Sequence, residues 1–277
     1  MKLLILCLLV LYNAALIRTL DTASVSLLDT PNILETDSFR AMRLGPAVSS
    51  RDWIDCEELA TLMLGHEMDL SRLKRLPGIS LRIGPANRGV LFRLADGYRT
   101  VLSDLKCFPV PELFDPSVPE ITYEDSWKDE RSYGGERNHE GCDVMGDNLP
   151  SGFYPVVSMT DGTVEKIGWL EKGGYRIGIR SPSGAYFYYA HLSRYAGGLC
   201  EGTDVHAGEL LGFMGDSGYG PEHTTGKFPV HLHVGIYLKT AHCEELSVNP
   251  YWILRYLEKK RTRARYLPET VVLFRGF

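Results

Sequence analysis

The spacing of apolar residues divides the chain into two parts of different character. Between residues 52 and 76, apolar residues recur every three to four positions and a Pro-Gly pair follows them. This period predicts one or two amphipathic helices that end at the pair. Alternating runs over residues 80–83 and 90–94 predict two short strands. We therefore expect residues 51–115 to form a small α+β or helical accessory region.

Four prolines between residues 109 and 119 mark a boundary, and short alternating segments dominate beyond it. These segments are residues 162–167, 175–179, 186–190, 210–214 and 230–238. Many short strands at close spacing predict a mainly β domain, an antiparallel sheet or sandwich, over residues 116–257. A helix with proline near its first turn is expected over residues 249–257. Residues 258–277 are predicted to be a basic extension, with the run 259–265 on a solvated helix face.

The N-terminal residues have the pattern of an export signal. Lys2 precedes an apolar run over residues 3–12, and the stretch through Ile17 is shorter than the ~20 residues of a membrane span. Residues 1–20 are predicted to be a signal peptide or a retained membrane anchor. Residues 21–50, rich in polar residues, are predicted to be a linker. This places the protein outside the cytoplasm, secreted or tethered at the cell envelope.

Charge and cysteine content exclude several classes of protein. A net charge of −5 argues against a nucleic acid partner, because phosphate binding needs a basic surface. Of six cysteines, Cys7 lies in the predicted leader, and the remaining five cannot all pair within one chain. The absence of Cys-x-x-Cys excludes a zinc ribbon and a thioredoxin-like site. We expect mostly free thiols with one disulfide at most.

Four of the eight histidines and one aspartate fall in three short motifs. The motifs are His139-Glu-Gly-Cys-Asp143, Tyr189-Ala-His191-Leu-Ser193 and His231-Leu-His233. This set is sufficient for a metal held by three protein ligands, with the open position that distinguishes a catalytic zinc site. Alternation places His231 and His233 on one face of a strand, so that one can bind the metal and the other can reach the water or substrate.

His139 and Asp143 are four residues apart, which is roughly 13 Å on a straight strand and too far for one ion. Gly141 between them disfavours a helix, so we expect a turn or bulge to bring both side chains to one centre. One carboxylate and two imidazoles suit zinc. Cys142 is a second possible ligand in this motif, but we prefer to interpret it as a bystander.

Each motif taken alone also has a purely structural explanation. Alternation along residues 186–191 places Phe187, Tyr189 and His191 on one face, where a histidine can be a core residue. Asp143 alone can be a turn former, and a His-x-His pair can be an ordinary polar strand face. The combination favours a metal site. The sequence contains no His-Glu-x-x-His helix, Gly-x-Ser-x-Gly elbow or glycine-rich phosphate loop, which excludes the classes built on them.

Taken in order, the motifs resemble those of the lysostaphin/LytM-type zinc metallopeptidases. The resemblance is carried by Arg137-Asn-His139-Glu-Gly-Cys-Asp143, Tyr189-Ala-His191-Leu-Ser193, Val205-His-Ala-Gly208, Leu211-Gly-Phe-Met-Gly215-Asp-Ser-Gly218 and His231-Leu-His233-Val-Gly. It covers about residues 121–257. It implies the compact β fold called the duplicated hybrid motif. The implied activity is zinc-dependent hydrolysis of peptide bonds in peptidoglycan cross-links or stem peptides, with peptidoglycan as the partner.

The resemblance also implies roles for individual residues. Its ligands for one Zn²⁺ correspond to His139, Asp143 and His233. His191 and His231 correspond to the pair that flanks the attacking water, without indicating which is the base. Upstream, Tyr133 resembles a tyrosine that helps to stabilise the transition state in some members.

Two alternatives to an active enzyme remain open at the level of the sequence. The domain could be a catalytically silent scaffold or regulator of cell-wall hydrolysis, or an enzyme held latent by residues 21–115. The run over residues 219–228 is longer than the common pattern of the family. The bond that is cleaved therefore cannot be carried over from relatives.

Overall fold

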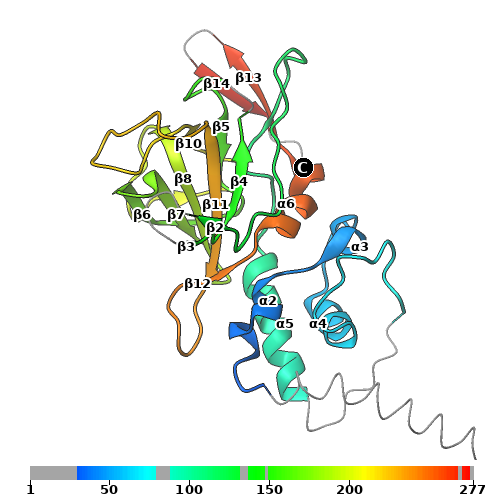
Figure 1. Ribbon diagram of the computed structural model, residues 1–277. Coiled ribbons are helices and arrows are strands. Elements are labelled where there is room, and N and C mark those ends of the chain that lie inside the picture. The colour runs from blue at the N-terminus through cyan, green and yellow to red at the C-terminus, as the bar shows by residue number, and fades with distance from the viewer. Residues whose placement is uncertain (1–29, 79–87, 132–136, 147–148, 268–269, 275–277) are drawn as a thin grey trace, which may run out of the picture.

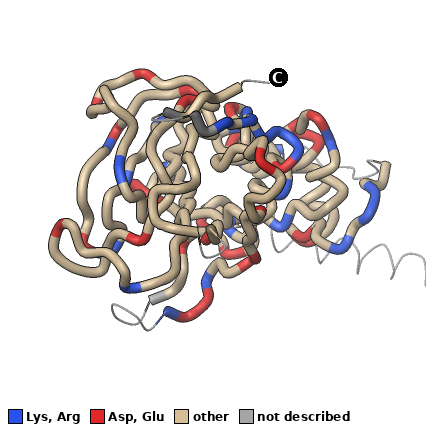
Figure 2. Tube along the Cα trace, turned by 90° about the horizontal axis from the view of Figure 1, so that it is seen from above, with Lys and Arg blue, Asp and Glu red and all other residues tan. Residues whose placement is uncertain are grey.

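The computed structural model describes residues 30–78, 88–131, 137–146, 149–267 and 270–274 (Figure 1). Helices near the N-terminus gather at one end of a β domain. The predicted signal peptide or anchor, residues 1–20, lies outside the described residues. Over the described ranges, no helix combines the length and the apolar composition needed to cross a membrane. Residues of both charges are spread over the molecule (Figure 2).

Over its described residues the N-terminal region is mainly helical, the second of the two expected alternatives. Its helices are η1 (Ile33–Glu35), α2 (Asp37–Arg40), α3 (Gly45–Ser49), α4 (Cys56–Gly65) and α5 (Arg88–Leu102). The first three fall within the predicted linker, so that prediction is wrong for this stretch. Its scattered apolar residues, among them Ile33, Phe39 and Leu44, are fully buried. Their burial outweighs the polar composition, because each contributes about 1.5–3 kcal/mol.

Helix α5 overturns the strand predicted over residues 90–94. Val90, Leu94, Tyr98 and Val101 recur every three or four residues, and all four are buried. A window of five residues was too short to distinguish this helical period from a strand. The other predicted strand, residues 80–83, lies outside the described residues.

The β domain is built on one nine-stranded sheet with the path β12-β11-β8-β7-β6-β9. Its strands are β4 (Cys142–Met145), β5 (Pro155–Val157), β6 (Gly162–Leu170), β7 (Gly174–Arg180), β8 (Tyr186–Tyr195), β9 (Asp204–Val205), β10 (Leu210–Met214), β11 (His231–Leu238) and β12 (Leu246–Val248). Off this path, β4 pairs with β11, and β10 pairs with β5 and β8. Every pairing is antiparallel. The mainly β prediction and its five strands are confirmed.

Alternation gives the sheet a core face and an open face. Phe187 and Tyr189 of β8 are fully buried, as are Leu232, Val234 and Ile236 of β11. The residues between them, which include both histidines of β11, point to the opposite face. Since β11 lies between β4 and β8, side chains from three neighbouring strands meet on that face.

The C-terminal segment continues the fold. Helix α6 (Tyr251–Leu257) is followed by η3 (Glu258–Lys260), β13 (Arg263–Leu267) and β14 (Thr270–Phe274). The basic run 259–265 therefore forms a 3-10 turn and a strand, and its assignment to a helix face is wrong. β13 pairs with β14 and, in parallel, with β1 (Glu112–Leu113). A two-stranded ribbon, β2 (Glu130–Arg131) and β3 (Arg137–Asn138), precedes β4.

The helical region and the β domain share one hydrophobic core. Helix α3 packs against α6, α2 against β12, and α5 against β11. No disulfide is formed by Cys56, Cys107, Cys142, Cys200 and Cys243. This agrees with the expectation that the thiols are mostly unpaired.

Candidate metal centre

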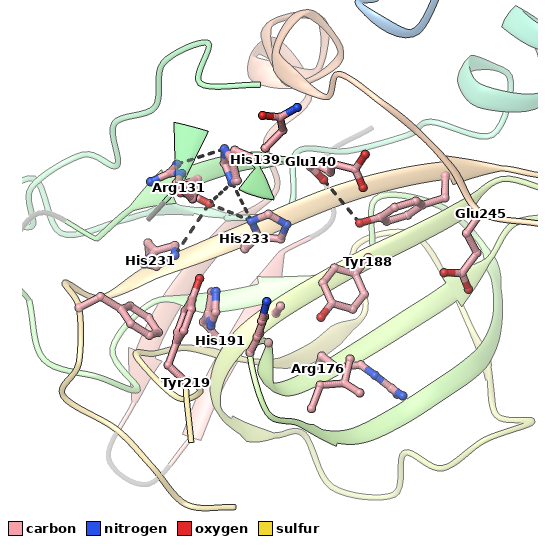
Figure 3. Close-up of a pocket in the computed structure, with 18 of the residues that line it drawn as sticks. Arg131, His139, Glu140, Arg176, Tyr188, His191, Tyr219, His231, His233 and Glu245 are labelled. Atoms are coloured by element: carbon pink, nitrogen blue, oxygen red, sulfur yellow. Dashed lines mark hydrogen bonds and ion pairs between the residues drawn. The ribbon is translucent and has the colours of Figure 1, made fainter. Parts of the chain in front are cut away.

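His139, Asp143 and His233 bring one donor atom each to a common point (Figure 3). His139 Nε2 lies 3.0 Å from Asp143 Oδ1 and 3.1 Å from His233 Nδ1. His233 Nδ1 lies 2.9 Å from Asp143 Oδ1. Asp143 of β4 stands directly opposite His233 of β11 in the strand register. His139 precedes β4 in a short turn, as the spacing of the motif predicted.

Neighbouring groups orient these donors. His139 Nδ1 donates to the Ser126 carbonyl at 3.0 Å, so its Nε2 presents a lone pair to the centre. Arg131 Nη2 donates to Asp143 Oδ2 at 2.9 Å, which leaves Oδ1 directed at the two imidazoles. Sequence reasoning missed Arg131 and Ser126, because neither belongs to a motif and only the folded chain brings them to the donors.

Gly141 is required for the close approach of the first motif to β11. A Cβ atom at this position would lie 2.4 Å from His233 Cε1 and 2.5 Å from His233 Nε2. Real Cβ atoms do not come so close to a ring. A side chain here would therefore displace His233 from the other two donors.

The protonation states suit a cation. Burial opposes ionisation of Asp143, but its contacts with His139 and His233 hold the pKa of this carboxyl well below its usual range. Burial lowers the pKa of His233, so the imidazole is neutral. A carboxylate and neutral imidazoles are the forms that bind metals. Cys142 is buried in the core, where burial raises its thiol pKa, which supports the bystander interpretation.

Two further imidazoles, those of His191 and His231, stand beside the donors. Their ring centroids lie 4.7 Å apart. His231 Nδ1 donates to the Pro229 carbonyl at 2.8 Å, and His191 Nδ1 donates to the Ser217 carbonyl at 2.8 Å. Each ring therefore keeps Nε2 as an acceptor. Burial lowers the pKa of His191 to about 3, so it is neutral near pH 7.

A β-bulge overturns the predicted face of His191. Tyr175 pairs with Leu192 and Ile177 pairs with Tyr189, so Ala190 and His191 both stand opposite the single residue between them on β7. His191 has a φ of 61°, in the left-handed region. The extra residue turns His191 toward the metal donors, while Phe187 and Tyr189 stay in the core. Strict alternation could not reveal this shift.

A groove of about 840 Å³ contains these groups. Tyr219 and Phe228, from the long segment 219–228, line it beside His191. The Tyr219 ring stacks on His191 with centroids 6.0 Å apart, and the Phe228 ring lies 4.7 Å from it edge-on. The sequence marked this segment as unusual but did not indicate these two side chains. Tyr133 lies outside the described residues.

A His/Asp/His donor set, with two further imidazoles beside it in a sheet-lined groove, is an arrangement suited to metal-dependent hydrolysis. The model of peptidase family M23 matches residues 137–250, a range that contains all five of these residues. The chain belongs to this family, and the expected resemblance to LytM-type peptidases is confirmed.

Two similar proteins extend the comparison. A crystal structure from Ruminococcus gnavus, described as a candidate glycyl-glycine endopeptidase LytM, is 44% identical, with a TM-score of 0.72. The match covers 87% of this chain and 97% of that one. An L-Ala–D-Glu endopeptidase of Bacillus subtilis (strain 168) is 43% identical over 152 residues. That match covers 55% of this chain and 44% of the relative, so the chain spans less than half of that relative's length.

Proposed function

We propose that the protein is a zinc-dependent metalloendopeptidase that hydrolyses peptide bonds in bacterial peptidoglycan, in cross-links or stem peptides, at the cell envelope. The observation that carries the proposal is the convergence of three metal donors beside the imidazoles of His191 and His231. Membership of a peptidase family supports the reaction class. Both similar proteins described above are named as endopeptidases, which supports the kind of bond.

The donor set fits one zinc ion. Zinc–ligand bonds of about 2.0–2.1 Å in tetrahedral geometry place donors about 3.3 Å apart, and the three donors here lie 2.9–3.1 Å apart. The donors are two imidazoles and a carboxylate, a set typical of catalytic zinc. When bound, zinc polarises the peptide carbonyl and lowers the pKa of water to about 7.

The protein's own groups then move the protons. Nε2 of one histidine, His191 or His231, accepts the proton of the attacking water, and the other donates to the oxyanion or the leaving amine. The backbone carbonyl partner of the accepting histidine holds its ring in the tautomer with an unprotonated Nε2, and the donating histidine has to carry a proton on Nε2 as well as on Nδ1. Arg131 keeps Asp143 oriented through its hydrogen bond to Oδ2. Tyr133 enters the proposal through its place in the motif, as a stabiliser of the transition state.

The alternatives of a silent scaffold or a latent enzyme receive less support. A silent scaffold usually lacks a ligand, whereas here His139, Asp143 and His233 converge. A latent enzyme needs its groove covered. Within the described ranges 30–78 and 88–115, no residue lines the groove.

The direct test is digestion of purified peptidoglycan by the zinc-loaded protein, with mass spectrometry of the fragments. We expect Asp143→Ala to lose zinc and activity together. His191→Gln should retain zinc and lose activity by about 10²–10⁴-fold, as expected for a general acid or base. Zinc content is measured on each variant by atomic absorption. Full hydrolysis by His191→Gln would refute its role, and an inactive zinc-loaded parent would refute the proposed function.

A further inference from the structure

Arg176 is a cation on the floor of the groove that the proposed mechanism does not use. It lies on β7 opposite the bulge at Ala190 and His191. Figure 3 shows it beside Tyr188, and both residues line the groove. The ring of Tyr188 contacts His233, with centroids 6.0 Å apart. Arg176 therefore lies one strand away from His191 of β8 and two strands away from His231 of β11.

The guanidinium of Arg176 lacks a partner within the described part of the chain. Its Nη1 is buried and makes no hydrogen bond. It forms no ion pair within 4.0 Å with a described carboxylate. Such a donor is costly to leave unpaired, because burial removes its water without a replacement. A group held in this state is suited to receive a ligand.

Arg180, four residues further along β7, is an arginine whose guanidinium does have a carboxylate partner. Its Nη2 donates to Glu165 Oε1 at 2.7 Å, and its Nε bonds the other carboxylate oxygen. This arginine is satisfied within the protein and does not line the groove. The two arginines lie on the same face of β7, but only Arg180 has a carboxylate partner, Glu165, within the described protein.

The charge around Arg176 favours an anion. Five basic residues line the groove, namely Arg131, Lys166, Lys172, Arg176 and Lys227. Three acidic residues line it, namely Glu140, Asp143 and Glu245. Glu140 is paired with Arg40 at 3.2 Å, and Asp143 belongs to the metal centre. Glu245 lines the same groove but forms no ion pair within 4.0 Å with any described residue, so it makes no direct contact with the Arg176 guanidinium.

We infer that Arg176 binds a carboxylate of the substrate, so that the groove selects an acidic cell-wall peptide over an uncharged glycine chain. The inference rests on the proposed function and specifies its substrate class. Arginine holds a carboxylate through two parallel hydrogen bonds, which matches the unpaired donors here. Because neighbouring strands lie roughly 5 Å apart, the carboxylate belongs to a residue within about two positions of the scissile bond.

The two similar proteins are named for bonds that differ in whether a side-chain carboxylate lies beside them. A bond between L-Ala and D-Glu has a residue with a second carboxyl group beside it, whereas a glycyl-glycine bond has no side chain on either side. The unpaired guanidinium of Arg176 therefore favours a substrate of the first kind. A glycine chain offers the buried Nη1 only neutral carbonyl oxygens and no carboxylate.

The test uses the full zinc-loaded chain and two stem peptides that contain the L-Ala–D-Glu bond. One has a free carboxylate on the glutamate beside the bond, and the other has a carboxamide there. We expect kcat/KM for the acid to exceed that for the amide by about 10–100-fold, as a charged hydrogen-bonded contact predicts. Arg176→Gln should reduce this ratio to about one. Arg180→Gln, the matched control, should keep the ratio of the parent.

Equilibrium binding of both peptides to the same proteins separates this inference from the proposed function. If the parent hydrolyses neither peptide, the proposed function fails, but tighter binding of the acid that depends on Arg176 still supports the inference. Equal kcat/KM and equal affinity for the two peptides in the parent would overturn it. An equal loss on both peptides in Arg176→Gln would also overturn it, because that result indicates only a structural role.

Discussion

At the scale of single residues, backbone carbonyl groups decide how the imidazoles are used. His139, His191 and His231 each donate from Nδ1 to a main-chain oxygen, so each presents Nε2. His233 is the exception, because its Nδ1 faces Asp143. A ring held by one nitrogen has a defined tautomer and little rotational freedom, which favours both metal binding and proton transfer.

Gly141→Ala tests whether the approach of the turn to His233 is essential. The added methyl would meet the imidazole at 2.4 Å, so the ring has to move away from the other donors. We expect affinity for zinc to fall about 10-fold or more, the effect typical of disturbing the surroundings of a ligand. Competition with a chromogenic chelator measures it.

Gly197→Ala is the control for that substitution. Its Cβ would meet nothing within 4 Å, and the residue is exposed. Zinc affinity should therefore equal that of the parent. If Gly141→Ala also bound zinc as tightly as the parent, the argument from close approach would be wrong.

His191 gives a prediction for the pH dependence of stability. Burial lowers its pKa from 6.5 to about 3 in the folded protein. Between these values the unfolded chain binds a proton that the folded chain does not, so acidification favours unfolding. The stability of the metal-free protein should be highest above pH 6.5 and should fall toward pH 3. The free energy of unfolding, measured with urea at pH 7 and at pH 4.5, should fall less in His191→Gln than in the parent. An equal fall in both proteins would contradict the lowered pKa of His191.

At the scale of elements, the bulge divides β8 into two parts that pair with different strands. Before it, residues 186–190 pair with β11 beside the metal donors, and after it residues 192–195 pair with β10. The same irregularity turns His191 into the groove and places Arg176 opposite it. A local break in register thus builds part of the site without a break in the sheet.

Removal of a buried tyrosine hydroxyl should change the free energy of unfolding in opposite directions at Tyr98 of α5 and Tyr189 of β8. The hydroxyl of Tyr98 is buried without a hydrogen bond to any described residue, so Tyr98→Phe should raise the free energy of unfolding by about 1 kcal/mol. The hydroxyl of Tyr189 accepts from the Met159 amide at 2.8 Å, so Tyr189→Phe should lower it by about 1–3 kcal/mol. Urea unfolding of both variants decides the signs. Destabilisation by Tyr98→Phe would indicate that its hydroxyl has a partner.

At the scale of the whole molecule, the helical region is part of the peptidase rather than an attachment to it. Phe108 and Val110, fully buried, continue the shared core past the last residue of α5. β1 lies before residue 116 and pairs with β13 near the C-terminus. A boundary at residue 115 would therefore divide both a core and a sheet.

Removal of residues 1–115 tests this view against the latent alternative. The fragment 116–277 would expose the apolar faces of α6 and β12 and lose β1. We expect a lower midpoint of thermal unfolding and no gain in peptidoglycan hydrolysis per folded molecule, because no described residue of the removed part lines the groove. Circular dichroism and a dye-release assay measure these. A stable fragment that is more active than the full chain would favour latency.

Part of the fold and of the candidate site can be predicted from the sequence. Five of the nine strands of the sheet are predictable because each alternates over at least five residues, and the candidate donors are predictable because their motifs are short and specific. The helices within residues 33–49 are not predictable from a local window, because they bury residues against partners far away in the chain. Residues 90–94 are too few to distinguish the helical period of α5 from a strand.

Some features of this protein follow from local order along the chain. They include the antiparallel strands, the turn at Gly141 and the four histidines and one aspartate that are candidates for the site, because alternation, glycine placement and motif spacing act over a few residues. Other features depend on contacts between distant segments. The orientation of His191, the hold of Arg131 on Asp143 and the unpaired state of Arg176 arise when strands meet in a particular register. Register is a property of two strands together, and neither strand specifies it alone.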